Sequence, residues 1–164
     1  DAIGICVPGL CRHYYDNHFW PERLETCEDE EILQWLERHL CMIPMEPRCP
    51  GCSVVEGQDI TPGKVRALAA SAERCWTAIM NMDLAAFATA YKDSFHAQVA
   101  MFPAMIQGSV PDYIEKYSAM EDVLAWKMPG AGGGGYLAVV VKNAGEFCNA
   151  HPEAIELRIR RSGM

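Results

Sequence analysis

A dense run of glycines most constrains what this chain can fold into. Residues 129–135 read Pro-Gly-Ala-Gly-Gly-Gly-Gly and stand between two β-prone segments, 123–127 and 136–141. Glycines at this density disfavour both helix and strand, because each one costs backbone entropy and packs no side chain. The run therefore predicts a loop between two strands. We expect a functional loop rather than a plain connector, because successive backbone N–H groups in such a segment can form an anion-binding concavity.

Two common nucleotide-binding motifs do not fit this loop. It lacks the Gly-Lys-Ser/Thr ending of a Walker A loop. A Gly-x-Gly-x-x-Gly match can be drawn from Gly130 to Gly135. However, a Rossmann fingerprint opens a helix, and here a strand pattern follows. Because the loop lies between two strands, we expect it to contribute little to the hydrophobic core.

The order of predicted elements from Leu40 onward indicates a fold class. The segments with strand-like composition are 40–46, 123–127, 136–141 and 155–160. Helix-start signals precede the remaining segments, at Thr61-Pro62, Asp83, Ser109 and Asn143. The resulting order is strand, helices, strand, strand, helix, strand, which is the split βαβ or ferredoxin-like order. We therefore predict an α+β fold with an antiparallel sheet and helices packed on one face.

Length and charge exclude several classes of protein. A chain of 164 residues fits one domain or two small ones. The net charge of −8 argues against non-specific nucleic-acid binding, which needs clustered Lys and Arg. No stretch approaches the roughly 20 apolar residues of a membrane-spanning helix. We therefore expect neither nucleic acid nor a membrane as a partner.

The chain has eight cysteines, and their context favours free thiols. Cys41 and Cys75 lie within apolar patterns, where a free thiol acts as a small hydrophobic group. No signal peptide is visible, so we expect a reduced, cytoplasmic protein. Cys49 and Cys52 form a Cys-x-x-Cys pair, but a structural zinc site usually needs a second pair, and a redox motif should open a helix. We interpret them as loop cysteines and expect no metal site.

The glycine run and its flanks resemble a known family motif. From Lys127, the sequence Lys-Met-Pro-Gly-Ala-Gly-Gly-Gly-Gly is followed by a strand pattern. This is similar to the C-terminal glycine motif of the GHMP kinases, the family of galactokinase, homoserine kinase, mevalonate kinase and phosphomevalonate kinase. That motif has Thr or Ser where this chain has Pro129. Pro8-Gly9-Leu10, Tyr14-Tyr15 and the helical pattern at 32–40 resemble the sugar-phosphorylating branch, near heptose and fucose kinases.

The resemblance implies a division of the chain and an activity. Residues 1–39 correspond to the end of an N-terminal kinase lobe and a connecting helix, and 40–164 to the ferredoxin-like C-terminal domain. The implied activity is ATP- and Mg²⁺-dependent phosphorylation of a sugar hydroxyl. The family's main phosphate loop belongs to the N-terminal lobe and is absent here. We therefore expect this chain to be part of a longer kinase, with that lobe as its partner, and to show no turnover alone.

The resemblance also suggests site residues. Asp1 matches the position of the family's catalytic Asp, which acts on the substrate hydroxyl. Arg12 and Tyr15 are candidates for a sugar pocket, although the same residue types also pack interfaces between lobes. The expected phosphate- and substrate-binding residues of the glycine motif are Lys127, Gly130, Ala131, Gly132, Gly133, Gly134 and Gly135.

Other functions stay open at this stage. Pro129 and the absent phosphate loop leave room for a non-catalytic relative that binds a small ligand in a regulatory or scaffolding role. A Cys-dependent metal or redox module is a further alternative. The sequence identifies neither the sugar nor the oligomeric state, and a homodimer is one option.

Overall fold

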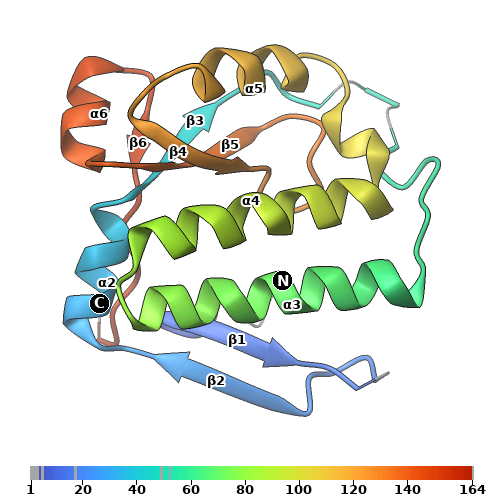
Figure 1. The fold of residues 1–164 in the computed structure, drawn as a ribbon, viewed down its shortest axis with the longest axis horizontal. Coiled ribbons are helices and arrows are strands. Elements are labelled where there is room, and N and C mark those ends of the chain that lie inside the picture. The colour runs from blue at the N-terminus through green and yellow to red at the C-terminus, as the bar shows by residue number, and fades with distance from the viewer. Residues whose placement is uncertain (1–3, 5, 17, 49, 52, 164) are drawn as a thin grey trace.

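Two antiparallel sheets and a set of helices make up the fold. The computed structural model describes residues 4, 6–16, 18–48, 50–51 and 53–163, and their arrangement is α+β (Figure 1). Strands β1 (Leu10–Tyr14) and β2 (Arg23–Cys27) form a hairpin. The second sheet contains β3 (Leu40–Pro44), β4 (Val123–Lys127), β5 (Tyr136–Val141) and β6 (Ile155–Glu156). Its spatial order is β4-β5-β3-β6, and every neighbouring pair is antiparallel.

Side-chain caps set the start of most helices. The helical elements are α2 (Glu30–Glu37), α3 (Pro62–Met80), α4 (Leu84–Met101), the 3-10 helix η1 (Pro103–Ile106), α5 (Val110–Ser118) and α6 (Ala144–Ala150). Asp29, Thr61, Asp83 and Asn143 each accept a hydrogen bond from a backbone N–H of the first turn. The starts predicted at Thr61, Asp83 and Asn143 are therefore confirmed. None of the helices in the described ranges is long and apolar enough to cross a lipid bilayer.

The four-stranded sheet is covered by helices on both faces. Val139 of β5 belongs to one hydrophobic cluster with Tyr117 of α5 and Phe147 of α6. Its neighbour Val140 belongs to a second cluster with residues of α2, α3 and α4, among them Phe87. Successive strand residues point to opposite faces, so the two clusters lie on opposite sides of the sheet.

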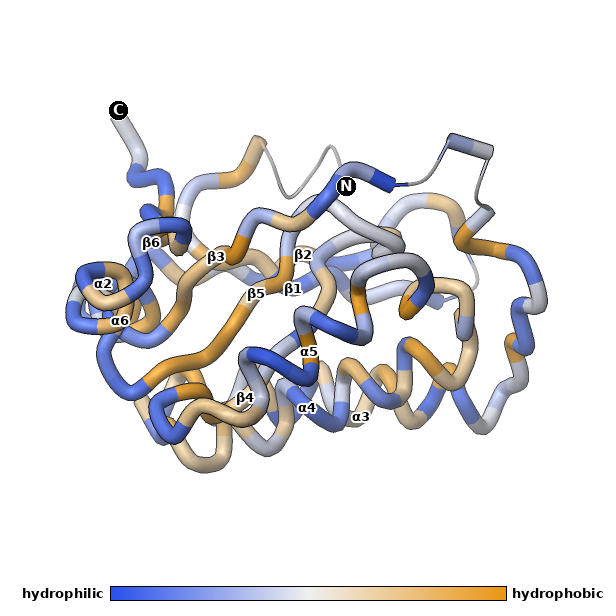
Figure 2. Tube along the Cα trace, turned by 90° about the horizontal axis from the view of Figure 1, so that it is seen from above, coloured by the Kyte–Doolittle hydropathy of each residue, from blue (hydrophilic) through white to orange (hydrophobic). Residues whose placement is uncertain are grey.

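The expectation of helices on one face therefore holds for α5 and α6 but is wrong for α2, α3 and the first part of α4, whereas Phe95 farther along α4 belongs to the same cluster as α5 and α6. The sequence of β5 carries the reason, because residues 137–141 are all buried. A continuous apolar run of this kind is typical of a strand that is covered on both faces. Figure 2 shows β5 as a hydrophobic segment, whereas hydrophobic and hydrophilic residues alternate along α3 and α4.

The last predicted strand is shorter than its alternating sequence suggests. β6 pairs with β3 only at Ile155 and Glu156. Beyond that point the backbone turns to other partners. The Ile159 N–H donates to the buried carboxylate of Glu37, and the Arg160 carbonyl accepts from the Gly9 N–H. The final segment therefore ties the C-terminal part of the chain to α2 and to the start of the hairpin.

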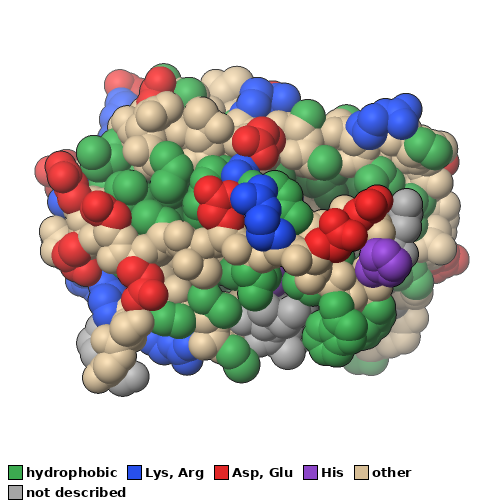
Figure 3. Space-filling model, turned by 90° about the horizontal axis from the view of Figure 1, so that it is seen from below, with side chains coloured by type: hydrophobic (Ala, Val, Ile, Leu, Met, Phe, Trp, Pro, Cys, Tyr) green, Lys and Arg blue, Asp and Glu red, His purple; other side chains and the backbone are tan. Residues whose placement is uncertain are grey.

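The hairpin lies along α3, on the side of the α3–α4 pair away from the four-stranded sheet (Figure 1). Arg12 of β1 joins the two elements, because it forms ion pairs with Glu25 of β2 and with Glu73 of α3. Figure 3 shows this face of the molecule, where charged side chains of both signs meet near the centre and hydrophobic side chains lie to either side.

Candidate functional site at the glycine loop

The loop between β4 and β5 has a backbone that only glycine adopts readily. All five of its glycines have positive φ: Gly130 (65°), Gly132 (74°), Gly133 (77°), Gly134 (141°) and Gly135 (92°). Residues with a Cβ are disfavoured in this region. The loop therefore requires glycine at these five positions because of their positive φ angles.

Neighbouring segments hold the loop in place. The Gly133 N–H donates to the Met105 carbonyl over 2.8 Å, and the Gly135 N–H donates to the Glu46 carbonyl over 3.0 Å. The Arg48 guanidinium donates twice to the Gly132 carbonyl, from Nε at 3.1 Å and from Nη2 at 2.8 Å. The base of the loop is thus fixed by backbone and side-chain hydrogen bonds.

Close packing is a second reason for glycine at this site. A Cβ on Gly132 would lie 2.9 Å from Met105 side-chain atoms, and one on Gly134 would lie 2.7 Å from the Glu46 carbonyl oxygen. Gly132 and Gly133 are buried, and the Met128 side chain is fully buried in the core. The expectation that the loop contributes little to the core is therefore wrong, because half of the loop is packed against 46–48 and η1.

Four backbone N–H groups of the loop have no hydrogen-bond acceptor within the described part of the chain, and they indicate what kind of ligand the loop can bind. Within the described part of the chain, the N–H groups of Gly130, Ala131, Gly132 and Gly134 donate no hydrogen bond. Gly130 and Ala131 are exposed at the tip of the loop. Unpaired backbone donors on a loop held in one conformation suit contact with an anion such as a phosphate.

Lys127 brings a positive charge to the base of this loop. Its Nζ donates to the Gln98 side-chain oxygen over 2.5 Å, and no ion pair joins it to a carboxylate among the described residues. Burial lowers the pKa of Lys127 to about 8, although the nearby Cys75 thiol acts in the opposite direction. A partly buried ammonium group without a counter-ion favours the approach of an anion.

Gln98 of α4 connects the lysine to the tip of the loop. Its side-chain oxygen accepts from Lys127, and its side-chain nitrogen donates to the Gly130 carbonyl over 3.2 Å. Sequence reasoning missed both Gln98 and Arg48. No local pattern marks either residue, because their loop partners lie 32 and 84 residues away.

Arg12 and Tyr15 are not brought to the loop. Arg12 donates to Glu25 and Glu73, and its guanidinium lies over the rings of Tyr14 and Trp76, 4.7 and 5.0 Å from their centroids. Tyr15 is 57% exposed on the hairpin. Since the hairpin lies across α3 from the four-stranded sheet, these residues and the glycine loop occupy different parts of the molecule (Figure 1).

Asp1, Cys49 and Cys52 lie outside the described residues. The six cysteines that the structure does describe are Cys6, Cys11, Cys27, Cys41, Cys75 and Cys148, and all are free thiols. In the same described ranges, no group of three or more His, Cys, Asp or Glu side chains is placed to hold a metal ion.

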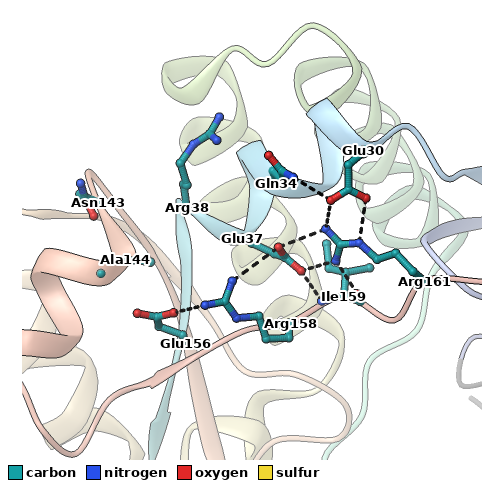
Figure 4. A pocket seen from close by; sticks show the side chains of 11 residues that line it. Glu30, Gln34, Glu37, Arg38, Asn143, Ala144, Glu156, Arg158, Ile159 and Arg161 are labelled. Atoms are coloured by element: carbon teal, nitrogen blue, oxygen red, sulfur yellow. Dashed lines mark hydrogen bonds and ion pairs between the residues drawn. The ribbon is translucent and has the colours of Figure 1, made fainter. Parts of the chain in front are cut away.

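A separate cleft of about 650 Å³ lies between α2, the start of α6 and the C-terminal segment (Figure 4). Its charged residues mostly satisfy one another. The Glu37 carboxylate, with only 7% of its side chain exposed, accepts from Arg161 and from the Ile159 N–H. Arg161 also pairs with Glu30 over 2.9 Å, and Arg158 pairs with Glu156 over 2.8 Å. This network clamps the C-terminal segment onto α2.

A scan against models of known protein families finds no match to the chain, and a search of curated proteins finds no significant relative. Support for a function therefore comes from the residues and geometry described above.

Proposed function

We propose that the chain is the C-terminal part of an ATP-dependent small-molecule kinase of the GHMP type, which phosphorylates a sugar hydroxyl. The observation that carries this proposal is the glycine loop. It combines the motif that begins at Lys127 with five glycines at positive φ and with unpaired amides beside a partly buried ammonium group. This set of features suits contact with a phosphate group.

The fold is compatible with this proposal. Read from β6, the sheet order is β6-β3-β5-β4, with α5 and α6 packed on the same face. We interpret this as a ferredoxin-like arrangement, in which α3 and α4 enlarge the first crossover and cover the opposite face. The proposed C-terminal domain then spans 40–164, and residues 1–39 supply the hairpin and α2.

Phosphoryl transfer is catalysed mainly by positioning and by neutralising charge. In the proposed site, the amides of Gly130 and Ala131 donate to phosphate oxygens, and the Lys127 ammonium supplies positive charge. Gln98 orients that ammonium group toward the loop. Asp1 is the proposed group that acts on the sugar hydroxyl.

Mg²⁺ is expected with ATP, where it would neutralise phosphate charge. No hydrogen bond or ion pair joins a carboxylate side chain to residues 127–135 within the described chain. Among the described residues, no group of three or more His, Cys, Asp or Glu side chains is placed to hold a metal ion, so the proposed site assigns no protein ligand to Mg²⁺.

A kinase assay tests the proposed activity. The chain is assayed with ATP, Mg²⁺ and a panel of hexoses and heptoses, alone and as part of the full product of its gene. We expect phosphorylated sugar from the full product, and none from the chain alone because the main phosphate loop is absent. Turnover by the chain alone would contradict the proposed division between two lobes. An inactive, correctly folded full product would contradict the kinase proposal.

Pro129 favours one alternative, a non-catalytic protein that binds a phosphorylated or otherwise anionic small ligand. Its position carries a hydroxyl residue in the family motif, whereas proline has neither a hydroxyl nor a backbone N–H. Binding of a sugar phosphate at the loop by a full product that lacks turnover would support this alternative.

A further inference from the structure

The two sulfur atoms of Cys41 and Cys148 meet inside the larger hydrophobic cluster. Cys41 lies on β3 and is fully buried, and Cys148 lies near the end of α6 and is partly buried against the same cluster. Their Sγ atoms are 3.6 Å apart. A disulfide bond is about 2.05 Å long, so a movement of roughly 1.5 Å along the line between the sulfurs would bring them within bonding distance.

We propose that Cys41 and Cys148 are a redox-active thiol pair, which a hydroperoxide converts into an intramolecular disulfide between β3 and α6. The bond would join residues that lie 107 positions apart. It is independent of the proposed kinase activity, because neither residue belongs to the glycine loop.

The difference in burial assigns an order to the two steps. Cys148 is the more accessible thiol, so it reacts first with the peroxide. Its sulfur loses two electrons to the peroxide O–O bond, which gives a sulfenic acid and one molecule of alcohol or water. The Cys41 sulfur then attacks the Cys148 sulfur, the S–O bond breaks, and the departing hydroxide takes the Cys41 proton and leaves as water.

The environment of Cys41 explains why it is the second reactant. Burial, together with the adjacent Cys148 side chain, raises the pKa of the Cys41 thiol well above its ordinary value. Cys41 therefore reacts slowly with reagents in solution. Its sulfur nevertheless lies 3.6 Å from the Cys148 sulfur, so it can attack the oxidised Cys148 without first diffusing to it.

Peptide mapping of the whole chain tests the proposal directly. The reduced chain is treated with hydrogen peroxide, free thiols are blocked with N-ethylmaleimide, and the protein is digested with trypsin without reductant. Cleavage after Arg38, Arg48, Lys142 and Arg158 isolates the two cysteines in peptides 39–48 and 143–158, each with a single cysteine. We expect these two peptides to appear as one species, two hydrogens lighter than their sum, and to separate after reduction.

Variants and thermal unfolding provide a second readout. A disulfide across so long a loop restricts the unfolded chain, so peroxide should raise the Tm of the wild-type protein by about 5 °C or more. Cys148→Ala should remove this increase, whereas Cys75→Ala, at a partly buried cysteine on α3, should retain it. Separate alkylation of both peptides after peroxide treatment would overturn the proposal, and so would a cross-link from either peptide to a different cysteine. The mapping alone decides the matter if a variant does not fold.

Discussion

Gly130 and Gly134 both have positive φ, but a side chain would meet different surroundings at each. A Cβ on Gly134 would lie 2.7 Å from the Glu46 carbonyl oxygen and 2.8 Å from the Arg48 backbone nitrogen, whereas one on Gly130 would meet nothing within 4 Å. Gly134→Ala should therefore destabilise the fold by about 2–4 kcal/mol, through backbone strain and overpacking. Gly130→Ala should cost only about 1 kcal/mol, from strain alone.

Urea unfolding of the two variants and the wild-type chain measures this difference. An equal loss in the free energy of unfolding for both variants would show that residues 46–48 move easily to accept a side chain at Gly134. The loop would then not be held in place by this segment. Gly133 resembles Gly134 more than Gly130, since it is buried and a Cβ there would lie 3.2 Å from Val54. Gly130→Ala is therefore the variant that probes ligand binding with the least effect on folding.

The charge state of Lys127 gives a prediction about pH. Burial lowers its pKa to about 8 from an ordinary value of 10.5, so the folded protein disfavours the charged amine. Below pH 8 the amine is charged in both the folded and unfolded states, and this cost is present in full. Between pH 8 and 10.5 the unfolded chain binds more protons than the folded one, so the cost declines as pH rises.

Lys127→Met should therefore be more stable than the wild-type chain at pH 7, by about 2 kcal/mol. This advantage should shrink between pH 8 and 10.5. Urea unfolding at pH 7, 9 and 10 checks the trend. Lys142→Met is a suitable control, because Lys142 pairs at the surface with Glu121 and Asp122. An advantage of Lys127→Met that does not change with pH would contradict an uncompensated charge at this position.

At the scale of elements, Glu37 fastens the C-terminal segment to α2. Burial tends to raise the pKa of Glu37, but hydrogen bonds from Arg161 and the Ile159 N–H outweigh it, and the pKa lies below its ordinary value. The carboxylate therefore contributes stability above its unfolded pKa, and this contribution is lost as pH falls through the folded pKa. Glu37→Gln should destabilise the protein by about 1–3 kcal/mol at pH 7.

Thermal unfolding at pH 7 and at pH 3 tests the role of Glu37. The difference between Glu37→Gln and wild type should be clear at pH 7 and smaller at pH 3, because the stability that the carboxylate contributes declines as pH falls below its unfolded pKa. Glu31→Gln, at an exposed position on the same helix, should change little at either pH. A Glu37→Gln variant as stable as wild type at pH 7 would show that the segment is held by other contacts.

Local sequence signals predicted the helix starts and the glycine loop. The features that the sequence did not predict depend on contacts between residues far apart in the chain. Thr61 and Asp83 cap helices through hydrogen bonds within three residues, and the loop glycines satisfy a backbone requirement of their own. By contrast, Gln98 joins the site through a residue 29 positions away in the chain. The early end of β6 likewise depends on Glu37, 122 residues before Ile159.

At the scale of the whole molecule, the four-stranded sheet lies between two groups of helices, and the glycine loop projects from one end of its β4–β5 pair. The long helices α3 and α4 follow β3 in the chain. Helix α3 and the first part of α4 pack on the sheet face opposite α5 and α6, which the sequence analysis had predicted to carry no helices. The two helices also place Gln98 beside Lys127 and separate the hairpin from the sheet. The α3–α4 pair thus contributes Gln98 to the candidate site and lies between the sheet and the hairpin that carries Arg12 and Tyr15.

A ¹H–¹⁵N titration of the labelled chain with ATP and Mg²⁺ at pH 7 tests most directly whether the loop contacts phosphate. We expect the largest shifts at the amides of Gly130, Ala131 and Gly132, and weaker binding at pH 9.5, where Lys127 is mostly uncharged. Gly130→Ala should weaken these shifts while the remaining spectrum stays that of a folded protein. Unchanged loop amides at saturating ATP, or shifts confined to the cleft beside α2, would contradict a phosphate-binding role for the glycine loop.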